Sequence, residues 1–153
     1  MFVSPNDCSA FFRGNMNQIE FEIPGKVIPK QRARHGFSRV YTPKKTRDYE
    51  KLVAMLARQA MRSEGLEMTS GPVSLNILFH FKIPKSWPQN KKQQVDSGGI
   101  VPTVRPDLTN LAKSIEDAMN GIVYKDDSQI YYLVCEKSYG NSDCAYITVE
   151  FHD

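Results

Sequence analysis

The stretch RPDLTNLAKSIEDAMNGIVYKDDSQI, residues 105–130, places two groups of acidic residues around one lysine. Asp107 and Lys113 lie in its first half, and Asp126 and Asp127 lie in its second half. Carboxylate oxygens bind Mg²⁺, which polarises a phosphodiester and helps to generate hydroxide. A nearby ammonium group can stabilise the extra negative charge of the transition state. These residue types therefore favour hydrolysis of a phosphodiester, provided that the two acidic groups meet in the folded chain.

Residues 105–121 have the pattern of an amphipathic helix. At roughly 100° per residue the apolar side chains share one arc. They are Leu108, Leu111, Ile115, Ala118, Met119 and Ile122. The opposite arc collects Asp107, Asn110, Lys113, Ser114 and Asp117. Pro106 suits the first turn, and Asn120-Gly121 suits the C-terminal end. Asp126 and Asp127 come after this helix, so the two acidic groups can meet only through tertiary folding.

Each acidic residue also has a purely structural interpretation. Asp107 in the first turn of a helix would complement the helix dipole, and KDDS is ordinary turn chemistry before a strand. Together with Lys113, however, the two acidic sites match what a divalent cation and a phosphate oxygen require.

Positive charge is concentrated in one segment. The chain of 153 residues has a net charge of +3, yet residues 26–62 hold eleven lysines and arginines against Asp48 and Glu50. Such asymmetry favours a polyanionic partner such as the DNA backbone, although a solvated basic helix face is the alternative. The candidates for backbone contacts are Lys30, Arg32, Arg34, Lys44 and Lys45, with His35 as a further one.

The remaining patterns predict a single α/β domain. Alternating apolar residues predict strands at 19–23, 73–81, 130–136 and 145–151. Helical spacing predicts a helix with Thr42 as N-cap, Pro43 at the first helical position and a stop at Gly65. Residues 30–41 suit a loop or an edge hairpin. The expected fold is a small mixed β-sheet with two principal helices.

Two segments lack a clear periodicity. Residues 84–106 are expected to form a mobile, basic loop, in which Trp87 either anchors the loop to the core or stacks on an unpaired base. Residues 1–15, which precede Met16, are expected to be a flexible arm or to reflect an upstream start, so that the domain spans residues 16–153.

Other classes of protein are disfavoured by the composition. The chain lacks an apolar run of roughly 18 residues and a signal peptide, so we expect a cytoplasmic protein without a membrane segment. Cys8, Cys135 and Cys144 show no CxxC spacing or pairing with histidine, so we expect thiols. A nucleotide-handling enzyme is disfavoured because the sequence has neither a P-loop nor a GxGxxG motif.

The 105–130 stretch resembles the signature of the RusA family of Holliday junction resolvases. That signature is usually PDxDN, a lysine three residues on, and later DDSQ. The segments GKVIPKQRAR, YTPKKTRDYEKLV and IPKSWPQNKKQQVDSGGIVPTVRPD are also similar to this family, particularly to its prophage-borne members. The resemblance therefore covers nearly everything after Met16.

The resemblance implies a homodimeric, Mg²⁺-dependent endodeoxyribonuclease with a mixed α/β fold, with Mn²⁺ as an alternative ion. It implies recognition of four-way DNA junctions and symmetric nicking of two strands in recombination and repair. Asp107 matches the first metal-binding aspartate and Lys113 the catalytic lysine. Asp127 matches the aspartate of the later group, with Asp126 beside it as a further metal ligand. Asn110 matches the asparagine of the motif, which would orient a carboxylate.

Thr109 departs from the pattern, because the family usually has a second aspartate there. A hydroxyl is a poor substitute for a carboxylate as a ligand of a hard cation, so either Asp117 or Asp126 supplies the charge or metal affinity is lower. On helical spacing Thr109 lies about 200° from Asp107, so a shared metal would require the first turn to be distorted or to sit at a loop junction. The rival hypothesis is a non-catalytic module that binds junctions or other DNA.

Overall fold

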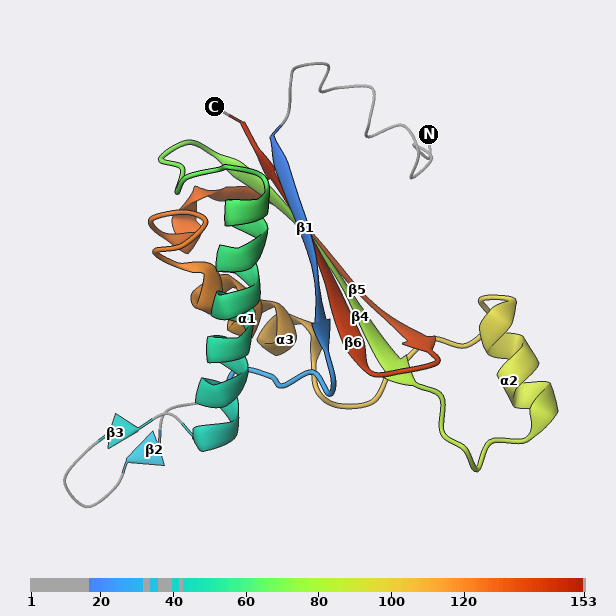
Figure 1. Cartoon of the computed structure of the whole chain (residues 1–153). Helices are drawn as coiled ribbons and strands as arrows, with labels where there is room; N and C mark the ends of the chain where they lie inside the picture. The colour runs from blue at the N-terminus through green and yellow to red at the C-terminus, as the bar shows by residue number, and fades with distance from the viewer. Residues whose placement is uncertain (1–16, 32–33, 36–39, 42, 153) are drawn as a thin grey trace.

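A mixed four-stranded sheet forms the centre of the computed structural model, which describes residues 17–31, 34–35, 40–41 and 43–152 (Figure 1). Its spatial order is β1-β6-β4-β5. The strands are β1 (Gln18–Pro24), β4 (Val73–Lys82), β5 (Ile130–Gly140) and β6 (Cys144–Phe151). Strand β6 pairs antiparallel with β1 and β4, whereas β4 and β5 are parallel. The expected mixed α/β domain and its four sheet strands are confirmed.

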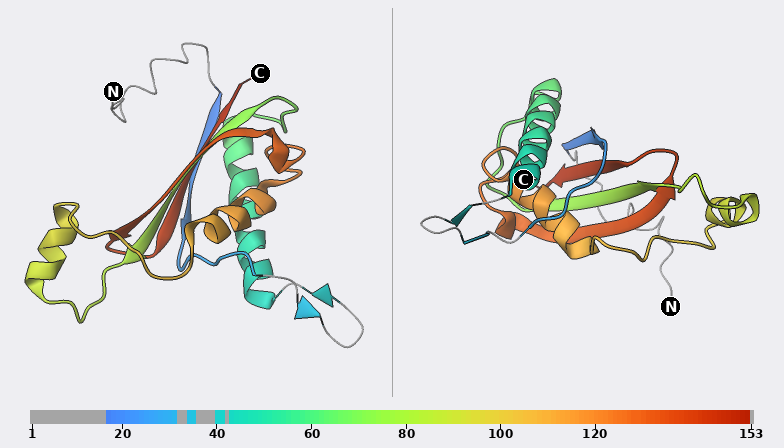
Figure 2. Two further views of the ribbon diagram at one scale, coloured as in Figure 1. Left: turned by 180° about the vertical axis from the view of Figure 1, so that it is seen from behind. Right: turned by 90° about the horizontal axis from the view of Figure 1, so that it is seen from below.

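Helices α1 (Lys44–Ser63) and α3 (Leu108–Met119) pack on the same face of this sheet (Figures 1 and 2). Helix α1 contacts β1, α3 contacts β5, and the two helices contact each other. Every second residue of β4 points toward them and is buried, namely Val73, Leu75, Ile77 and Phe79. The opposite sheet face carries the exposed residues Asn76 and Tyr146. The core therefore lies between one sheet face and two helices.

The parallel pairing of β4 with β5 decides where the acidic residues lie. Parallel neighbours need a long crossover, and residues 83–129 supply one that contains α3. Strand β5 starts beside the start of β4, with Ile130 opposite Val73. The residues just before β5, Asp126 and Asp127, are thereby returned to the neighbourhood of the helix that precedes them.

Helix α1 ends as the sequence predicts but starts differently. Gly65, with φ +64°, follows the last residue of the helix and its C-cap, which confirms the stop. Pro43 was predicted at the first helical position, but it is the N-cap, and the helix begins at Lys44. Thr42 lies outside the described residues.

Helix α3 begins three residues later than the earliest predicted position. Asp107 has an extended backbone, with φ −72° and ψ 147°, and occupies the N-cap position. The predicted apolar stripe is confirmed, because Leu111, Ile115 and Met119 are fully buried. Ser114 was placed on the exposed polar arc, and this was wrong. The segment after β1 covers it, and its hydroxyl donates to the carbonyl oxygens of Ile28 at 2.9 Å and Leu111 at 2.8 Å.

The long connection before α3 is not the irregular loop that the sequence suggested. It contains α2 (Gln89–Asp96), which has no buried residue. Periodicity missed this helix because it has no apolar stripe, although glutamine and lysine are good helix formers. Trp87 anchors the connection, because its ring packs edge-on against Tyr139 with 5.0 Å between centroids. The Nζ atom of Lys91 lies 3.8 Å from the centroid of the Trp87 ring.

A short hairpin precedes α1. Strand β2 (Arg34–His35) pairs antiparallel with β3 (Val40–Tyr41), which confirms the expected hairpin between residues 30 and 41. The arm expected at residues 1–15 lies outside the described residues. The helices that the structure describes are too short or too polar to span a lipid bilayer.

Candidate active site

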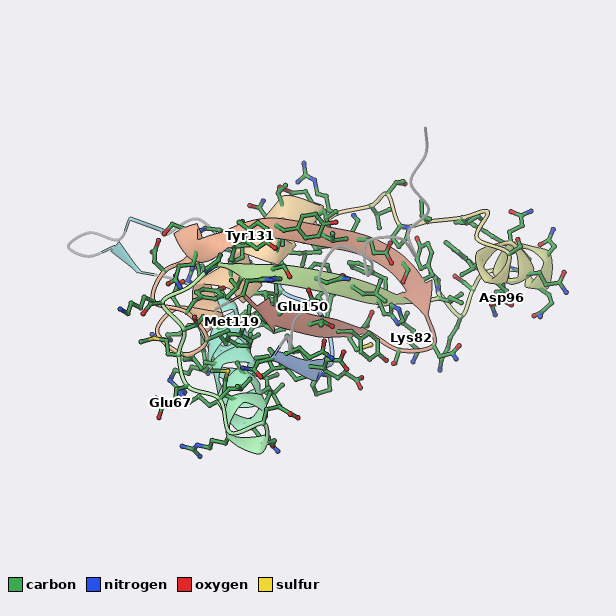
Figure 3. All side chains as sticks on the ribbon, turned by 90° about the horizontal axis from the view of Figure 1, so that it is seen from above. Glu67, Lys82, Asp96, Met119, Tyr131 and Glu150 are labelled. Carbon is green, nitrogen blue, oxygen red and sulfur yellow. The ribbon has the colours of Figure 1, made fainter. Side chains whose placement is uncertain are left out.

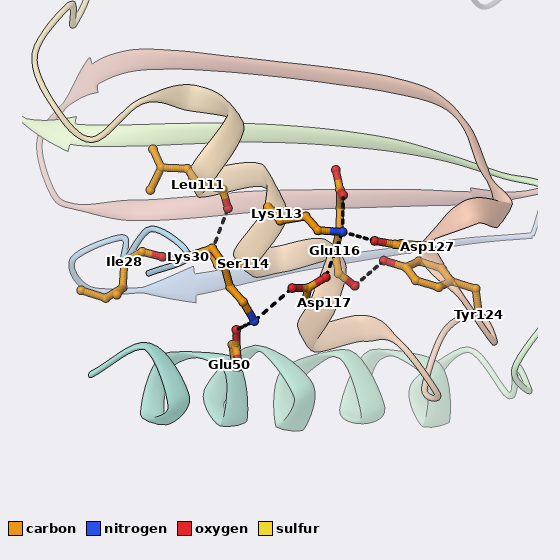
Figure 4. Close-up of polar contacts among 10 residues, drawn as sticks. All are labelled: Ile28, Lys30, Glu50, Leu111, Lys113, Ser114, Glu116, Asp117, Tyr124 and Asp127. Carbon is orange, nitrogen blue, oxygen red and sulfur yellow. Dashed lines mark hydrogen bonds and ion pairs between the residues drawn. The ribbon is translucent and has the colours of Figure 1, made fainter. Parts of the chain in front are cut away.

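The Lys113 side chain joins Asp117 of its own helix to Asp127 of the later acidic group (Figure 4). From the middle of α3 its Nζ atom contacts Oδ2 of Asp127, which opens the 3-10 turn Asp127–Gln129 before β5. It also lies 3.1 Å from Oδ1 of Asp117, one helical turn further on, and 3.9 Å from Oε2 of Glu116. The prediction that tertiary folding unites Lys113 with the later acidic group is confirmed for Asp127.

The carboxylates keep Lys113 in its charged form. The hydrogen bond to Asp127 is the largest cause that raises the pKa of Lys113 above its ordinary value, and Asp117 adds to it. Glu116 behaves differently, since its burial raises the pKa of its carboxyl. Lys113 is thus a permanent positive charge, half exposed to solvent, at the meeting point of α3 and the turn before β5.

The residues of the DDSQ sequence have two roles. Asp126 and Gln129 stabilise the turn, and Asp127 contacts Lys113. The Asp126 carboxylate accepts a hydrogen bond from the Ser128 backbone N–H at 3.0 Å. The Ser128 side chain and, after it, this backbone hydrogen bond lower the pKa of the Asp126 carboxyl. Gln129 closes the capping box, because its Oε1 accepts from the Asp126 backbone N–H at 3.1 Å. Its Nε2 donates to the carbonyl oxygens of Thr69 and Gly71 at 3.1 and 2.8 Å. Gln129 therefore fastens the turn to the segment before β4.

Asp107 lies at the other end of the site, exposed at the N-terminus of α3. Its Oδ2 accepts hydrogen bonds from Nδ2 of Asn110 at 2.8 Å and from Oγ1 of Thr109 at 3.3 Å. The backbone N–H of Asp107 and the Asn110 amide lower the pKa of this carboxyl, so it is ionised. The sequence left two ways for Asp107 and Thr109 to meet, a distorted first turn or a loop junction, and the structure shows the loop junction. Asp107 precedes the helix, so its side chain can turn back toward residue 109.

Lys137 of β5 fixes the chain that leads to Asp107. Its Nζ donates to the carbonyl oxygens of Val104 at 2.8 Å and Pro106 at 3.1 Å. Sequence reasoning missed this residue, although a lysine at the alternate strand position between Cys135 and Tyr139 was a usable signal. The strand that follows the turn thus also holds the loop that starts α3.

Lys30 extends the charge network behind the site. Its Nζ lies 2.6 Å from Oε1 of Glu50 in α1 and 3.0 Å from Oδ2 of Asp117 (Figure 4). Burial lowers the pKa of Lys30, but the two carboxylates outweigh it and raise the pKa overall. Its backbone N–H also donates to the Asn110 carbonyl at 2.8 Å. Lys30 was predicted to contact DNA, yet here its ammonium holds Asp117 in place.

The other predicted residues are dispersed. Lys44 and Lys45 are exposed at the start of α1. Arg32 lies outside the described residues, and for Arg34 and His35 only the backbone, in β2, is described. Within the described part of the chain, no three histidine, cysteine or acidic side chains form a group that could hold a metal ion. Asp107 is therefore not clustered with Asp126 and Asp127.

Sequence reasoning also missed Glu50 and Glu116. Glu50 is twenty residues from Lys30, so no local pattern could pair them. Glu116 could have been found, because it lies three residues after Lys113, a spacing that places the two side chains together on a helix, as the four-residue spacing does for Asp117.

Comparison with known proteins places the chain in a family. Residues 21–150 match the family model Endodeoxyribonuclease RusA. The chain belongs to the RusA endodeoxyribonuclease family. The matched region of this RusA-family protein contains the whole network from Lys30 to Asp127.

Two relatives are similar to this chain, and the second carries the family's name. The protein is 33% identical over 130 residues to YqaN, an uncharacterized protein of Bacillus subtilis (strain 168), an alignment that covers 81% of this chain and 89% of YqaN. It is 30% identical over 131 residues to the crossover junction endodeoxyribonuclease rusA of Lactococcus phage r1t, which covers 78% of this chain and 88% of the phage protein.

Gln129→Ala should loosen the turn that presents Asp127. The substitution leaves the Thr69 and Gly71 carbonyls without their donor, so we expect the free energy of unfolding to fall by about 1–3 kcal/mol. Urea denaturation followed by circular dichroism measures this. Gln93→Ala on the exposed side of α2 is the matched control and should change stability by less than about 0.5 kcal/mol. Equal stability of the two variants would show that Gln129 does not fasten the turn.

Proposed function

We propose that this RusA-family protein is a Mg²⁺-dependent endodeoxyribonuclease that resolves four-way DNA junctions by paired hydrolysis of phosphodiesters, in recombination and repair. The observation that carries the proposal is the Lys113 ammonium, held by Asp127 and Asp117 on the helix that begins at the ionised Asp107. Membership in an endodeoxyribonuclease family supports DNA as the substrate.

The acidic residues fit a hard divalent cation. Mg²⁺ usually binds through one or two carboxylates, keeps several waters and takes phosphate oxygens of the substrate, so a cage of three carboxylates is not required. Asp107 is exposed and ionised, which suits such an ion. We assign Asp107 as one metal ligand, and Asp127 with Asp126 as a second group of ligands that lies apart from it in the described chain. Mn²⁺, which shares the preference for oxygen, is an alternative.

The side chains around these ligands have separate roles in the proposed reaction. When bound, the cation polarises the scissile phosphate and lowers the pKa of a bound water. Lys113 stabilises the additional negative charge on the phosphate, and Asp117 and Asp127 keep its ammonium charged and in place. Asn110 and Thr109 orient the Asp107 carboxylate through their hydrogen bonds. Lys30 acts only through Asp117, as a positioning residue.

Contacts to the DNA backbone are assigned to the basic segment. Lys44 and Lys45 are exposed at the start of α1, next to the β2–β3 hairpin that carries Arg34 (Figure 1). With Arg32 they would neutralise phosphates and hold the substrate without reading its sequence. Paired cuts on a two-fold symmetric junction are most simply made by two copies of one site, so we propose a homodimer.

Asp107→Asn should separate cleavage from binding. Loss of a metal-binding carboxylate should slow single-turnover cleavage of a synthetic four-way junction in Mg²⁺ by ~10²-fold or more. Junction affinity, measured by gel shift without Mg²⁺, should stay the same or rise because a negative charge is removed. Asp96→Asn in α2 is the control and should cleave normally. Full cleavage by Asp107→Asn would refute the site.

Thr109 favours one alternative, a module that binds junctions without cutting them, because a threonine stands where the family usually has an aspartate. Cleavage of a four-way junction distinguishes the two hypotheses. An enzyme cuts the junction in Mg²⁺ or Mn²⁺ and leaves linear duplex intact, whereas a binding module retards the junction in gels but cuts it in neither metal.

Thr109→Asp should strengthen metal binding. The Thr109 hydroxyl is 3.3 Å from Oδ2 of Asp107, so a carboxylate at this position would add an anionic oxygen beside the proposed ligand. We expect the Mg²⁺ concentration for half-maximal junction cleavage to fall several-fold. Thr109→Asn introduces a side chain of the same shape as aspartate but without its charge, so it should leave this Mg²⁺ concentration unchanged. If the aspartate variant folds but its midpoint does not move, residue 109 lies outside the metal shell.

A further inference from the structure

Lys137 of β5 contacts the peptide group that leads into Asp107. Its Nζ atom donates to the carbonyl oxygen of Pro106 at 3.1 Å and to that of Val104 at 2.8 Å. The Pro106 carbonyl and the Asp107 N–H belong to one peptide unit. This unit is trans and planar, so its C=O and N–H point in opposite directions. A lysine that holds the carbonyl therefore also fixes the direction of the Asp107 N–H.

The N–H of this peptide unit is directed at the Asp107 carboxylate. It donates to the carboxylate of its own residue, and this hydrogen bond is the largest of the causes that lower the pKa of the Asp107 carboxyl. Asn110 donates to the same carboxylate from α3 at 2.8 Å. Lys137 thus lies on one side of a rigid peptide unit, and the Asp107 carboxylate lies on the other side.

The sheet holds Lys137 itself in place. Its side chain is half-buried, and its backbone pairs in register with Phe79, which is fully buried in the core. The Nζ atom lies 5.8 Å from the centroid of the Phe81 ring. Among the described residues Lys137 forms no ion pair with a carboxylate. Its ammonium is therefore committed to the two backbone carbonyls before Asp107.

Strand β5 is attached to both parts of the proposed site. The turn that carries Asp127 runs directly into the first residue of β5, and Asp127 contacts Lys113 of α3. Lys137, further along the same strand, contacts the chain just before α3. Asp107 is not clustered with the later acidic group within the described chain. The distance between the two groups of ligands is therefore set by how β5 holds α3 at these two points.

We propose that Lys137 is a positioning residue that sets the place of the Asp107 carboxylate for a divalent cation. It touches neither the cation nor the DNA and acts through the Pro106–Asp107 peptide unit. The proposal rests on the proposed function in one respect, the assignment of Asp107 as a metal ligand. Removal of a group that orients a metal ligand typically weakens metal binding by about 10–100-fold. The loss of Lys137 should therefore appear as weaker metal binding.

Mechanical support of the connection 83–106 is the competing role for Lys137. That connection has a second anchor on β5, because the Trp87 ring packs edge-on against Tyr139. Without Lys137 the connection would remain attached there, and the change would be confined to the residues just before α3. A lysine that only supports the fold would lower stability without changing metal affinity, so the two roles are separable.

Binding of Mn²⁺ without DNA tests the proposal, with free Mn²⁺ measured by electron paramagnetic resonance. Lys137→Met keeps the length of the side chain but removes its donors, and it should raise the Kd for Mn²⁺ by about 10-fold. Lys137→Arg keeps the charge and the donors, so its Kd should stay within a few-fold of the wild type. A Lys137→Met protein that folds and binds Mn²⁺ like the wild type overturns the proposal.

Lys82→Met is the matched control for the loss of one positive charge. Lys82 is exposed at the end of β4 that leads to α2 (Figure 3). Its ammonium makes no hydrogen bond or ion pair with the described residues. This variant should bind Mn²⁺ with wild-type affinity, and an equal weakening in both methionine variants would overturn the proposal because charge alone would explain it.

Junction cleavage separates a positioning role from a catalytic one. Lys137→Met should need more Mg²⁺ for half-maximal single-turnover cleavage, by the same factor as its Kd for Mn²⁺ rises. At saturating Mg²⁺ its rate should return to within a few-fold of the wild type, because the reacting groups are all present. A lower saturated rate with an unchanged Mg²⁺ midpoint overturns the proposal.

Urea denaturation shows whether each variant is folded. If Lys137→Met is unfolded, Lys137→Gln takes its place, because its shorter amide cannot reach both carbonyls, and the same weakening of Mn²⁺ binding is expected. If that variant is unfolded too, Lys137 supports the fold itself and the proposal is overturned. A wild type that binds Mn²⁺ but cuts no junction refutes the nuclease, while the Mn²⁺ affinities still decide the role of Lys137. A wild type that binds no Mn²⁺ refutes the metal assignment and this proposal with it.

Discussion

A single ammonium group, that of Lys113, is the constraint on which the site depends. Three carboxylates, those of Glu116, Asp117 and Asp127, lie around it, and without a positive charge between them they would repel one another at this distance. The same charge that holds α3 against the turn before β5 is the one that would meet a phosphate. Lys30 likewise lies between two carboxylates. It joins α1 to α3 because its ammonium pairs with Glu50 and with Asp117.

The sheet topology brings Lys113 of α3 close to Asp127 before β5. Parallel pairing of β4 with β5 forces the chain through a crossover that carries α3 over the sheet and back to the start of β5. Gln129 then anchors the returning turn to the chain before β4, and Lys137 anchors the loop before α3. The proposed catalytic groups, which come from two parts of the sequence, are thus held by contacts to the backbone of the scaffold, and the ends of Lys113 and Asp107 stay accessible.

Local patterns in the sequence predicted the elements well and their contacts poorly. Periods of two and of 3.6 residues identified the four sheet strands and the buried stripe of α3, because apolar burial dictates both. The same reasoning misplaced Ser114, whose burial depends on the distant segment at Ile28, and it overlooked α2, which buries nothing. It could not find the pairing of Lys30 with Asp117, since the partners lie far apart in sequence. Asp107, Lys113 and Asp127 were singled out by residue chemistry and by the resemblance to the RusA family. The metal-binding roles of the two aspartates and the catalytic role of Lys113 remain predictions.

The most direct test of the central claim is a double-mutant cycle on the ion pair between Lys113 and Asp127, read as single-turnover cleavage of a four-way junction in Mg²⁺. If the two residues act as one unit, Lys113→Met and Asp127→Asn should each slow cleavage by ~10²-fold or more, and the double variant should be little slower than either. Junction binding should persist in all three proteins. Cleavage by Lys113→Met within a few-fold of the wild type would contradict the assignment of Lys113 as the charge that stabilises the reacting phosphate.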